Sequence, residues 1–353
     1  MKLKQTTYIL LLSIFLSTVI TFSQSKDGTT STFRTEVDGI GTNALTFLEI
    51  GVGSRAMGMG GAYAAIANDV SSLYWNPAGV VWVENMEIQV SHNEWFLDSK
   101  YEFVGGVFPI PSLNSAVGIS FTTIGFDDQP VRTVNRPEGT GEYYDARDFA
   151  LGLTFASAIT DRFSFGITAK YLSSQIWHET ASAFATDLGI FYNTELEGLR
   201  LGFSMSNFGT TLKYAGRDIH TTVDPDKEIE NFDRVPAEYS TDSYPLPLLF
   251  RAGISYNVNM SDFGSTVFAV DLLHPSNAPE AINLGMEYSF LGMFFLRGGY
   301  QNLFDGENES GLTLGAGVDY YNNASNFGVR FDYAWNEWGL LDNSQSFSVG
   351  LVF

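Results

Sequence analysis

The sequence predicts an all-β fold: a 14-stranded antiparallel transmembrane β-barrel with a Gly/Ala-rich N-terminal hatch, built of short helices, in its lumen. Three observations support this prediction. The N-terminus has the features of an export signal, apolar and polar residues alternate from residue 86 to the end, and one Gly- and Ala-rich stretch, residues 48–82, precedes that alternation. We therefore divide the chain into a signal peptide (1–23), a flexible tail (24–45), a hatch (46–85) and a barrel (86–353).

Composition excludes several classes of protein. Charged residues make up 17% of the 353 residues, aromatic residues 15%, and there are 35 glycines, which fits neither a disordered chain nor a typical helical enzyme. The formal net charge of -21 argues against nucleic acid as a partner, because phosphate binding needs a basic face. The absence of cysteine excludes disulfides, thiolate metal sites and cysteine nucleophiles.

The first 23 residues have the pattern of a secretory signal peptide. Lys2 and Lys4 precede an apolar run over 9–20, and Thr21 and Ser23 are small residues at the spacing expected for cleavage before Gln24. The alternative is a membrane anchor, but the run is shorter than the ~20 residues that a spanning helix needs. Residues 24–45 are polar and rich in Thr, Ser and Gly, which predicts a flexible tail.

The next stretch is compatible with short helices but not with an ordinary core. Residues 57–62 are small or Met, so a helix there gains little from burial, whereas small residues allow close backbone approach in a confined space. Asp69 and Ser71 are suited to cap a following turn, and Pro77 pushes Asn76 out of helical geometry. No Lys-Ser/Thr follows Gly61, so this is not a phosphate loop. We predict a hatch in the barrel's periplasmic end.

From residue 86 onward the period is two. Between 326 and 335, Phe327, Phe331 and Trp335 share one face, while Gly328 and Asp332 share the other. An even number of strands of about ten residues is typical of transmembrane barrels. Fourteen such segments are predicted, at 86–96, 101–110, 114–124, 143–157, 162–176, 181–194, 198–208, 247–258, 263–272, 281–290, 293–302, 311–322, 325–335 and 344–353.

The alternative to a membrane barrel is a secreted soluble β-protein. The polar faces of the strands distinguish the two. They carry mostly Gly, Ser, Thr and Asn, while charge concentrates in the links, and small residues suit an enclosed lumen that admits a hatch. Long links at 125–142, 209–246 and 303–310 alternate with short ones, and the chain ends on an alternating strand with Phe353. Interfacial aromatic girdles are expected from Trp95, Trp177, Tyr192, Tyr300, Tyr320 and Trp335.

Arg55 is the residue of the hatch that most needs a partner. A buried guanidinium must be paired, and the barrel wall offers Asp332, Glu287 or Asp319. We expect Arg55 to anchor the hatch, with a contact to an anionic headgroup as the alternative.

No catalytic constellation is visible, so we expect no enzyme activity, no cofactor and no metal. The four histidines are far apart, and His274 before Pro275 is expected to shape a turn rather than to bind a ligand. Two acidic loops lack the spacing of a calcium loop, so solvated charge is expected there in preference to cation binding. These loops contain Asp224, Asp226, Glu228 and Glu230, and Asp305, Glu307 and Glu309.

Two blocks of residues resemble the PorV/PorQ family of outer-membrane proteins, which is similar to FadL-type fatty-acid transporters. The first block is Phe47–Ala56 with Arg55, then Met59, Gly60, Gly61 and Ala62, Asp69, and Trp75, Asn76, Pro77, Ala78 and Gly79. The second block is Asp271, His274, Pro275, Asn277, Glu280, Asn283, Gly285, Glu287, Tyr288, Arg297, Gly299 and Tyr300.

The resemblance implies a barrel in the outer membrane of a Gram-negative bacterium, surrounded by lipid. It implies the fourteen strands and the lumenal hatch of FadL-type proteins, and a role in binding or shuttling exported proteins with components of the type IX secretion system. The alternative is a FadL-like transporter with a hydrophobic ligand in its lumen. A lipase-type enzyme is a third reading, but no Ser/His pair in the sequence supports it.

Overall fold

The computed structural model describes residues 41–224, 234–260, 264–304, 311–322, 324–341 and 343–353. The predicted signal peptide, residues 24–40 of the predicted tail and all but Asp224 of the two acidic loops lie outside these residues.

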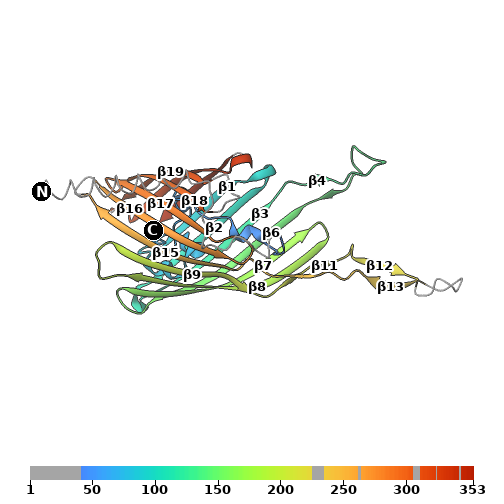
Figure 1. Cartoon of the computed structure of the whole chain (residues 1–353), viewed down its shortest axis with the longest axis horizontal. Coiled ribbons are helices and arrows are strands. Elements are labelled where there is room, and N and C mark those ends of the chain that lie inside the picture. The colour runs from blue at the N-terminus through green and yellow to red at the C-terminus, as the bar shows by residue number, and fades with distance from the viewer. Residues whose placement is uncertain (1–40, 225–233, 261–263, 305–310, 323, 342) are drawn as a thin grey trace, which may run out of the picture. The chain divides into compact units, whose positions relative to one another are not determined.

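Fourteen strands form one closed antiparallel barrel (Figure 1). Each strand pairs with the next one along the chain, and the first pairs with the last, so the sheet has no free edge. The predicted strand number is confirmed. The strands are β1 (Glu87–Glu94), β2 (Lys100–Ile110), β3 (Ser115–Gly125), β6 (Ala146–Ala158), β7 (Phe163–Ile176), β8 (Glu179–Asn193), β9 (Leu199–Gly209), β15 (Leu249–Asn259), β16 (Gly264–Pro275), β17 (Ala281–Phe290), β18 (Phe294–Leu303), β19 (Leu312–Asn322), β20 (Phe327–Glu337) and β21 (Asn343–Val352).

Strand bounds differ from the predicted ones by a few residues. β6 begins at Ala146 rather than at 143, because Tyr143 and Tyr144 form the short strand β5 (Tyr143–Tyr144), which pairs with β4 (Gln129–Pro130). β16 continues to Pro275 rather than ending at 272, because its last residues pair with the start of β15.

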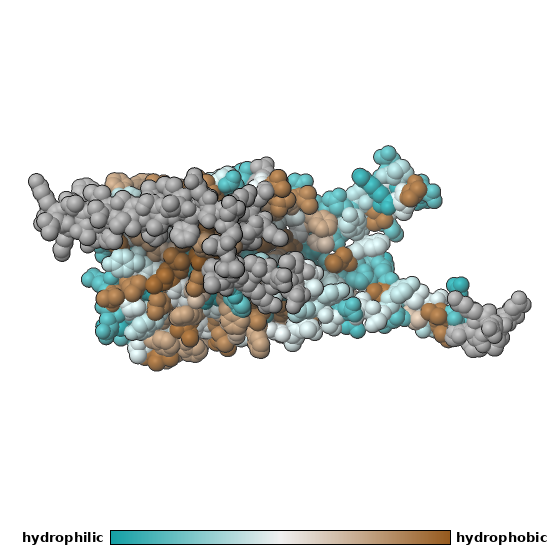
Figure 2. Space-filling model, viewed as in Figure 1, coloured by the Kyte–Doolittle hydropathy of each residue, from teal (hydrophilic) through white to brown (hydrophobic). Residues whose placement is uncertain are grey.

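The alternation places apolar side chains outside and polar ones inside. On β7, Ser164 and Thr168 are fully buried, while Phe165 and Ile167 are exposed on the outer face. Brown apolar residues gather over the barrel strands in Figure 2, and hydrophilic residues dominate the loops beyond them. An apolar outer wall around a polar interior is the arrangement of a barrel surrounded by lipid.

The links between strands differ at the two ends of the barrel. At one end, which we call the turn end, the links are short, for example residues 111–114, 159–162 and 194–198. At the other, which we call the loop end, residues 126–145 and 210–248 form long loops. The longer loop contains β10 (Leu212–Lys213), β11 (Ala215–Gly216), β12 (His220–Val223), β13 (Val235–Glu238) and β14 (Ser243–Tyr244), and the β12–β13 hairpin lies beyond the barrel strands in Figure 1.

Residues 41–86, which we call the inner segment, lie inside the ring of strands except for their exposed ends, 41–42 and 84–86. This segment forms η1 (Thr46–Glu49), α2 (Ser54–Met57), α3 (Ser72–Trp75) and η2 (Pro77–Trp82), and Ala56, Met59, Tyr63 and Val80 within it have no exposed surface. Three further single turns, η3 (Phe96–Asp98), η4 (Pro111–Leu113) and η6 (Gly339–Leu341), lie in links between strands. None of the helices in the described residues has the length and apolar character required to cross a bilayer.

The inner segment extends further than the predicted position at one barrel end. At the loop end, the Ala44 amide donates to the Pro245 carbonyl over 2.9 Å. Towards the turn end, Trp82 Nε1 donates to Ser164 Oγ over 3.0 Å. The segment therefore runs through the lumen from the loop end to the turn end, because its small residues allow it to pack along the whole interior wall.

Candidate functional site

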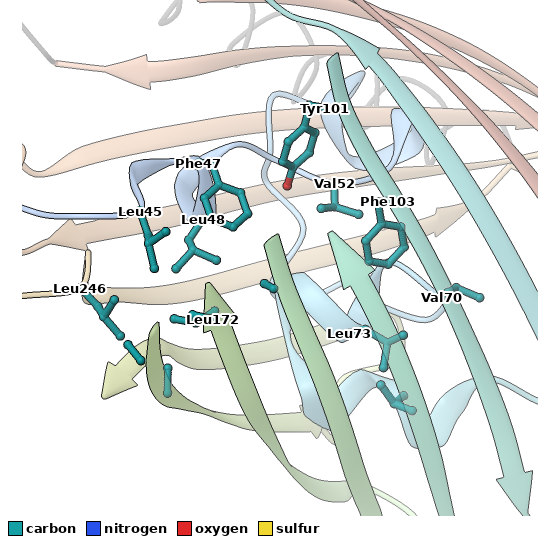
Figure 3. Close-up of a cluster of buried hydrophobic side chains, with 14 of the residues drawn as sticks. Leu45, Phe47, Leu48, Val52, Val70, Leu73, Tyr101, Phe103, Leu172 and Leu246 are labelled. Carbon is teal, nitrogen blue, oxygen red and sulfur yellow. The ribbon is translucent and has the colours of Figure 1, made fainter. Parts of the chain in front are cut away.

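The inner segment is held at the loop end by apolar contacts. Leu45, Phe47 and Leu48 belong to a buried cluster that also includes Leu246 of the long loop and Leu172 of β7 (Figure 3). Leu45 falls in the predicted flexible tail, but its burial shows that the last residues of that stretch are packed. The start of the inner segment is therefore part of the barrel's core.

Arg55 lies at the centre of a buried ion-pair cluster, which we define as Arg55, Asp69, Glu287, Arg297 and Asp332. Arg55 donates to both carboxylate oxygens of Glu287, Nη2 to Oε1 over 2.8 Å and Nε to Oε2 over 2.9 Å, and it reaches Asp69 over 3.2 Å. Arg297 joins Glu287 to Asp332 with two contacts of 2.6 Å. Of the three wall carboxylates expected for Arg55, Glu287 is the one it contacts.

Asp69 accepts hydrogen bonds from other residues of the inner segment. Its Oδ1 accepts hydrogen bonds from the Ser71 amide, at 3.0 Å, and from the Ser71 hydroxyl, while its Oδ2 accepts from Tyr63. Burial alone would raise the pKa of Asp69, but the charges of Arg55 and Arg330 and these hydrogen bonds hold it below its usual value. The Asp69 carboxylate is therefore ionised beside Arg55 at neutral pH.

The Asn76-Pro77-Ala78-Gly79 turn fastens the segment to the wall. Asn76 Nδ2 donates to the carbonyls of Ala64, over 2.9 Å, and Ile190, over 3.0 Å, and Asn76 Oδ1 accepts from the Ala78 amide. Pro77 begins η2 and lies against the backbone of β7 and β8, while Gly79 packs closely on the Ala67 carbonyl. One amide side chain thus connects two parts of the inner segment with β8.

The Met59-Gly60-Gly61 run lies against β17 and β18. Met59 is fully buried, and Gly60 adopts a φ of +66°. A Cβ on Gly60 would lie 2.6 Å from the Leu284 carbonyl oxygen and 2.8 Å from the Tyr300 amide nitrogen, so both its backbone conformation and its surroundings require glycine. Gly61 lies between Trp75 and Asn283.

The second block of residues contacts the first. Asp271 Oδ2 accepts from the Tyr63 amide over 2.9 Å and from the Ala64 amide over 2.8 Å. Asn277 Nδ2 donates to Glu49 over 3.0 Å. Glu287 pairs with Arg55 as described above, so residues some 200 positions apart in sequence form one interface inside the barrel.

Four further residues of the second block, Asn283, His274, Glu280 and Pro275, lie near the loop end. Asn283 Oδ1 accepts from the Asn302 amide over 2.8 Å. His274 Nδ1 contacts Glu280 Oε1 over 2.9 Å across the β16–β17 link. Pro275 lines a cavity next to this link.

This cavity, which we call the vestibule, lies between the inner segment and the loop end and has a volume of about 540 Å³. Trp75, Trp95 and Trp338 supply aromatic surface, and Glu49, Asp148 and Arg251 supply charge; other lining residues include Phe47, Ile50, Leu249 and Pro275. Burial raises the pKa of Glu49 above its usual value, although Asn277 and Arg251 oppose that shift. The volume falls within the range of small-molecule sites.

Trp95 differs from its predicted place in an outer aromatic girdle. Its ring packs edge-on against Trp338, with 5.2 Å between ring centroids, and both rings line the vestibule. The reason is that Trp95 follows the last residue of β1, where alternation no longer fixes the direction of the side chain.

Sequence reasoning missed Asp148 and Arg251, two of the three charged residues of the vestibule. Arg251 is the one charged side chain among the inward positions of β15, which otherwise carry Leu249, Gly253 and Ser255. This isolated charge on a small-residue face is the signal that could have identified it. In the described part of the chain, no three His, Asp or Glu side chains gather in a metal-binding arrangement.

A closed antiparallel barrel that is apolar outside, polar inside and filled by its own N-terminal segment is an outer-membrane β-barrel. A family model described as "Type IX secretion system protein PorV" matches residues 33–225, more than half of the chain. The chain therefore belongs to the PorV family. No curated protein sequence matches it.

Solved structures with a similar fold include two bacterial toluene transporters. The Pseudomonas putida toluene transporter TodX has a TM-score of 0.51 at 10% identity, over 86% of this chain and 96% of that one. The Ralstonia pickettii toluene transporter TbuX has a TM-score of 0.50 at 13% identity, over 85% and 97%. A Pseudomonas aeruginosa FadL homologue has a TM-score of 0.49 at 12% identity, over 88% and 98%. At this identity the first two establish a shared fold.

Proposed function

We propose that this barrel binds exported proteins at its loop end as part of type IX secretion, while the inner segment keeps the lumen closed. The observation that carries the proposal is the PorV family match over residues 33–225. The loop end supports it, because Tyr143, Tyr239 and Tyr244 are exposed on loops beyond the membrane-facing wall. Exposed aromatic side chains on loops held by a rigid scaffold are typical of protein-binding surfaces.

The filled lumen fits a docking barrel better than an open pore. Arg55, Asp271 and Asn76 each fix the inner segment to a different part of the wall. Withdrawing this segment would break the buried ion pair of Arg55 with Glu287, which is costly when one partner leaves. A barrel that stays closed can present its loops to a partner without leaking solutes.

The test is recovery of identified partners with a tagged barrel. The test variant combines Tyr143→Ser, Tyr239→Ser and Tyr244→Ser, which removes the exposed aromatic side chains of the loop end. The matched control keeps these tyrosines and replaces the turn-end link 159–162 with a Gly-Ser linker of equal length. We expect the unaltered barrel and the control to recover secreted proteins and translocon components, and the tyrosine variant to lose them. Recovery of neither class by the unaltered barrel would refute the proposal.

The second candidate is a transporter for hydrophobic small molecules. The fold shared with TodX and TbuX and the vestibule favour it. Toluene uptake into liposomes that contain the purified barrel would support this function. Uptake no faster than into empty liposomes, with an uptake signal from a TodX control, would exclude it.

A further inference from the structure

Arg251 is a buried cation that forms no direct ion pair in the described residues, although its charge acts at longer range on Glu49 and Asp271. Its residue surface is 4% exposed. Nη1 donates to Ser206 Oγ over 3.2 Å and Nη2 to Tyr74 Oη over 3.3 Å, but Nε has no hydrogen-bond partner. By contrast, Arg55, Arg297 and Arg330 in the same lumen each pair with carboxylates at 3.0 Å or less. A buried guanidinium that lacks such a partner indicates a place for an anionic group.

Because Arg251 lines the vestibule, an anionic group that pairs with it would lie in this cavity. Arg251 lines the cavity, and its guanidinium lies 5.1 Å from the Trp75 ring centroid and 5.2 Å from that of Tyr74. Cation–π contacts with these two rings restrict the orientation of the guanidinium. The planar N–H pattern of arginine matches a carboxylate or a phosphate, and the two carboxylates that line the same cavity disfavour the more highly charged phosphate.

The vestibule also carries negative charge. Glu49 and Asp148 line the same cavity, and neither forms an ion pair with Arg251. Glu49 accepts from Asn277, and Asp148 accepts from Ser174, so both carboxylates are held by neutral donors. A simple fatty acid would place its carboxylate near two like charges. A ligand with an additional ammonium group would instead match both signs of charge.

The walls between these charges are aromatic and apolar. Trp95 and Trp338 lie edge to face, and Ile50 and Leu249 line the same space. We propose that the vestibule binds a small zwitterion with an apolar side chain, an aromatic amino acid or a short peptide, whose carboxylate meets Arg251 and whose ammonium group meets Glu49 and Asp148. This site goes beyond the proposed docking function and does not depend on it.

The test uses phenylalanyl-phenylalanine and the complete barrel in lipid nanodiscs, with binding followed by isothermal titration calorimetry. We compare the free dipeptide with its N-acetylated form, its C-terminal amide and lauric acid. We expect the free dipeptide to bind, and each blocked form to lose roughly tenfold in affinity, because each lacks one charge-assisted contact. Equal or tighter binding of either blocked form or of lauric acid, or no binding of the dipeptide, would overturn the proposal.

Protein variants test which residue contacts each charged end of the dipeptide. Glu49→Gln should remove the difference in affinity between the free dipeptide and its N-acetylated form. Arg251→Gln should remove the difference in affinity between the free dipeptide and its C-terminal amide. Glu280→Gln is the matched control, since Glu280 pairs with His274 and does not line the vestibule. If Arg251→Gln fails to fold, the ligand comparison on the unaltered barrel still decides the outcome. Retained discrimination in folded Glu49→Gln would contradict the proposed ammonium contact.

Discussion

Single residues decide whether the inner segment stays in the lumen, and Arg55 is the foremost of them. The sequence alone pointed to Arg55, because a lone arginine among small residues requires a partner. The same argument gave Glu287 as one of three candidate partners, and the two family blocks came from the resemblance to known barrels. Arg251 was missed although it is an isolated charge on a small-residue face, because the sequence does not show that no carboxylate of the described residues forms an ion pair with it.

Arg55→Ala should loosen the inner segment without unfolding the barrel. The change leaves Glu287 with one cationic partner instead of two and removes the ion pair of Asp69, so we expect a loss of about 3 kcal/mol in the stability of the inner segment. Limited proteolysis of residues 46–85 measures this, with Arg162→Ala as the control. Arg162 pairs with exposed Glu195, and its loss should cost less than about 1 kcal/mol. Unchanged protease resistance in Arg55→Ala would contradict the anchoring role.

Asp69 should make the attachment of the inner segment sensitive to acid. Its pKa in the folded barrel lies below the usual 3.8, so its contribution to stability is complete above that pH and is lost as the pH falls through the lowered pKa. Protection of inner-segment amides from hydrogen exchange should therefore decrease below about pH 4. In Asp69→Asn this part of the pH dependence should disappear. If amide protection decreases by the same amount in Asp69→Asn, the pH dependence belongs to another titratable group.

At the scale of elements, the strands were predictable and the packing of the inner segment was not. Alternation of apolar and polar residues locates a strand to within a few residues, because every second side chain must face lipid. The path of residues 41–86 has no such period. The path of the inner segment follows the free space along the inner face of the barrel wall. The position of that space depends on small residues of several strands together.

Gly202 of β9 provides a test of this steric fit. A Cβ on Gly202 would overlap the Ala64 carbonyl of the inner segment. Gly202→Ala should lower the stability of the packed barrel by about 1–3 kcal/mol, the usual cost of overpacking. Gly298→Ala on β18 is the matched control, because the nearest atom to a Cβ there is the Thr313 carbonyl oxygen at 3.9 Å. Thermal unfolding of both variants in detergent measures the difference, and equal midpoints would show that the inner segment does not press on the wall.

At the scale of the whole molecule, the closed barrel gives its two ends different roles. The long loops and the vestibule lie at the loop end, and the chain ends at the turn end, where the Phe353 amide donates to the Met86 carbonyl over 2.9 Å. Barrels in the outer membrane place long loops outside the cell and short turns in the periplasm. A binding function at the loop end therefore requires that end to face the medium.

The absence of cysteine from the chain allows this orientation to be measured directly. Leu97 lies in the β1–β2 link at the loop end and is 94% exposed, while Leu196 lies in the β8–β9 link at the turn end and is 68% exposed. In intact cells, a membrane-impermeant maleimide should label Leu97→Cys and should label Leu196→Cys only after the outer membrane is permeabilised. Both positions are exposed in the folded barrel, so a difference in labelling reports on orientation and not on burial. The reverse pattern would place the loops and the vestibule in the periplasm, where neither could meet a partner or a ligand from outside the cell.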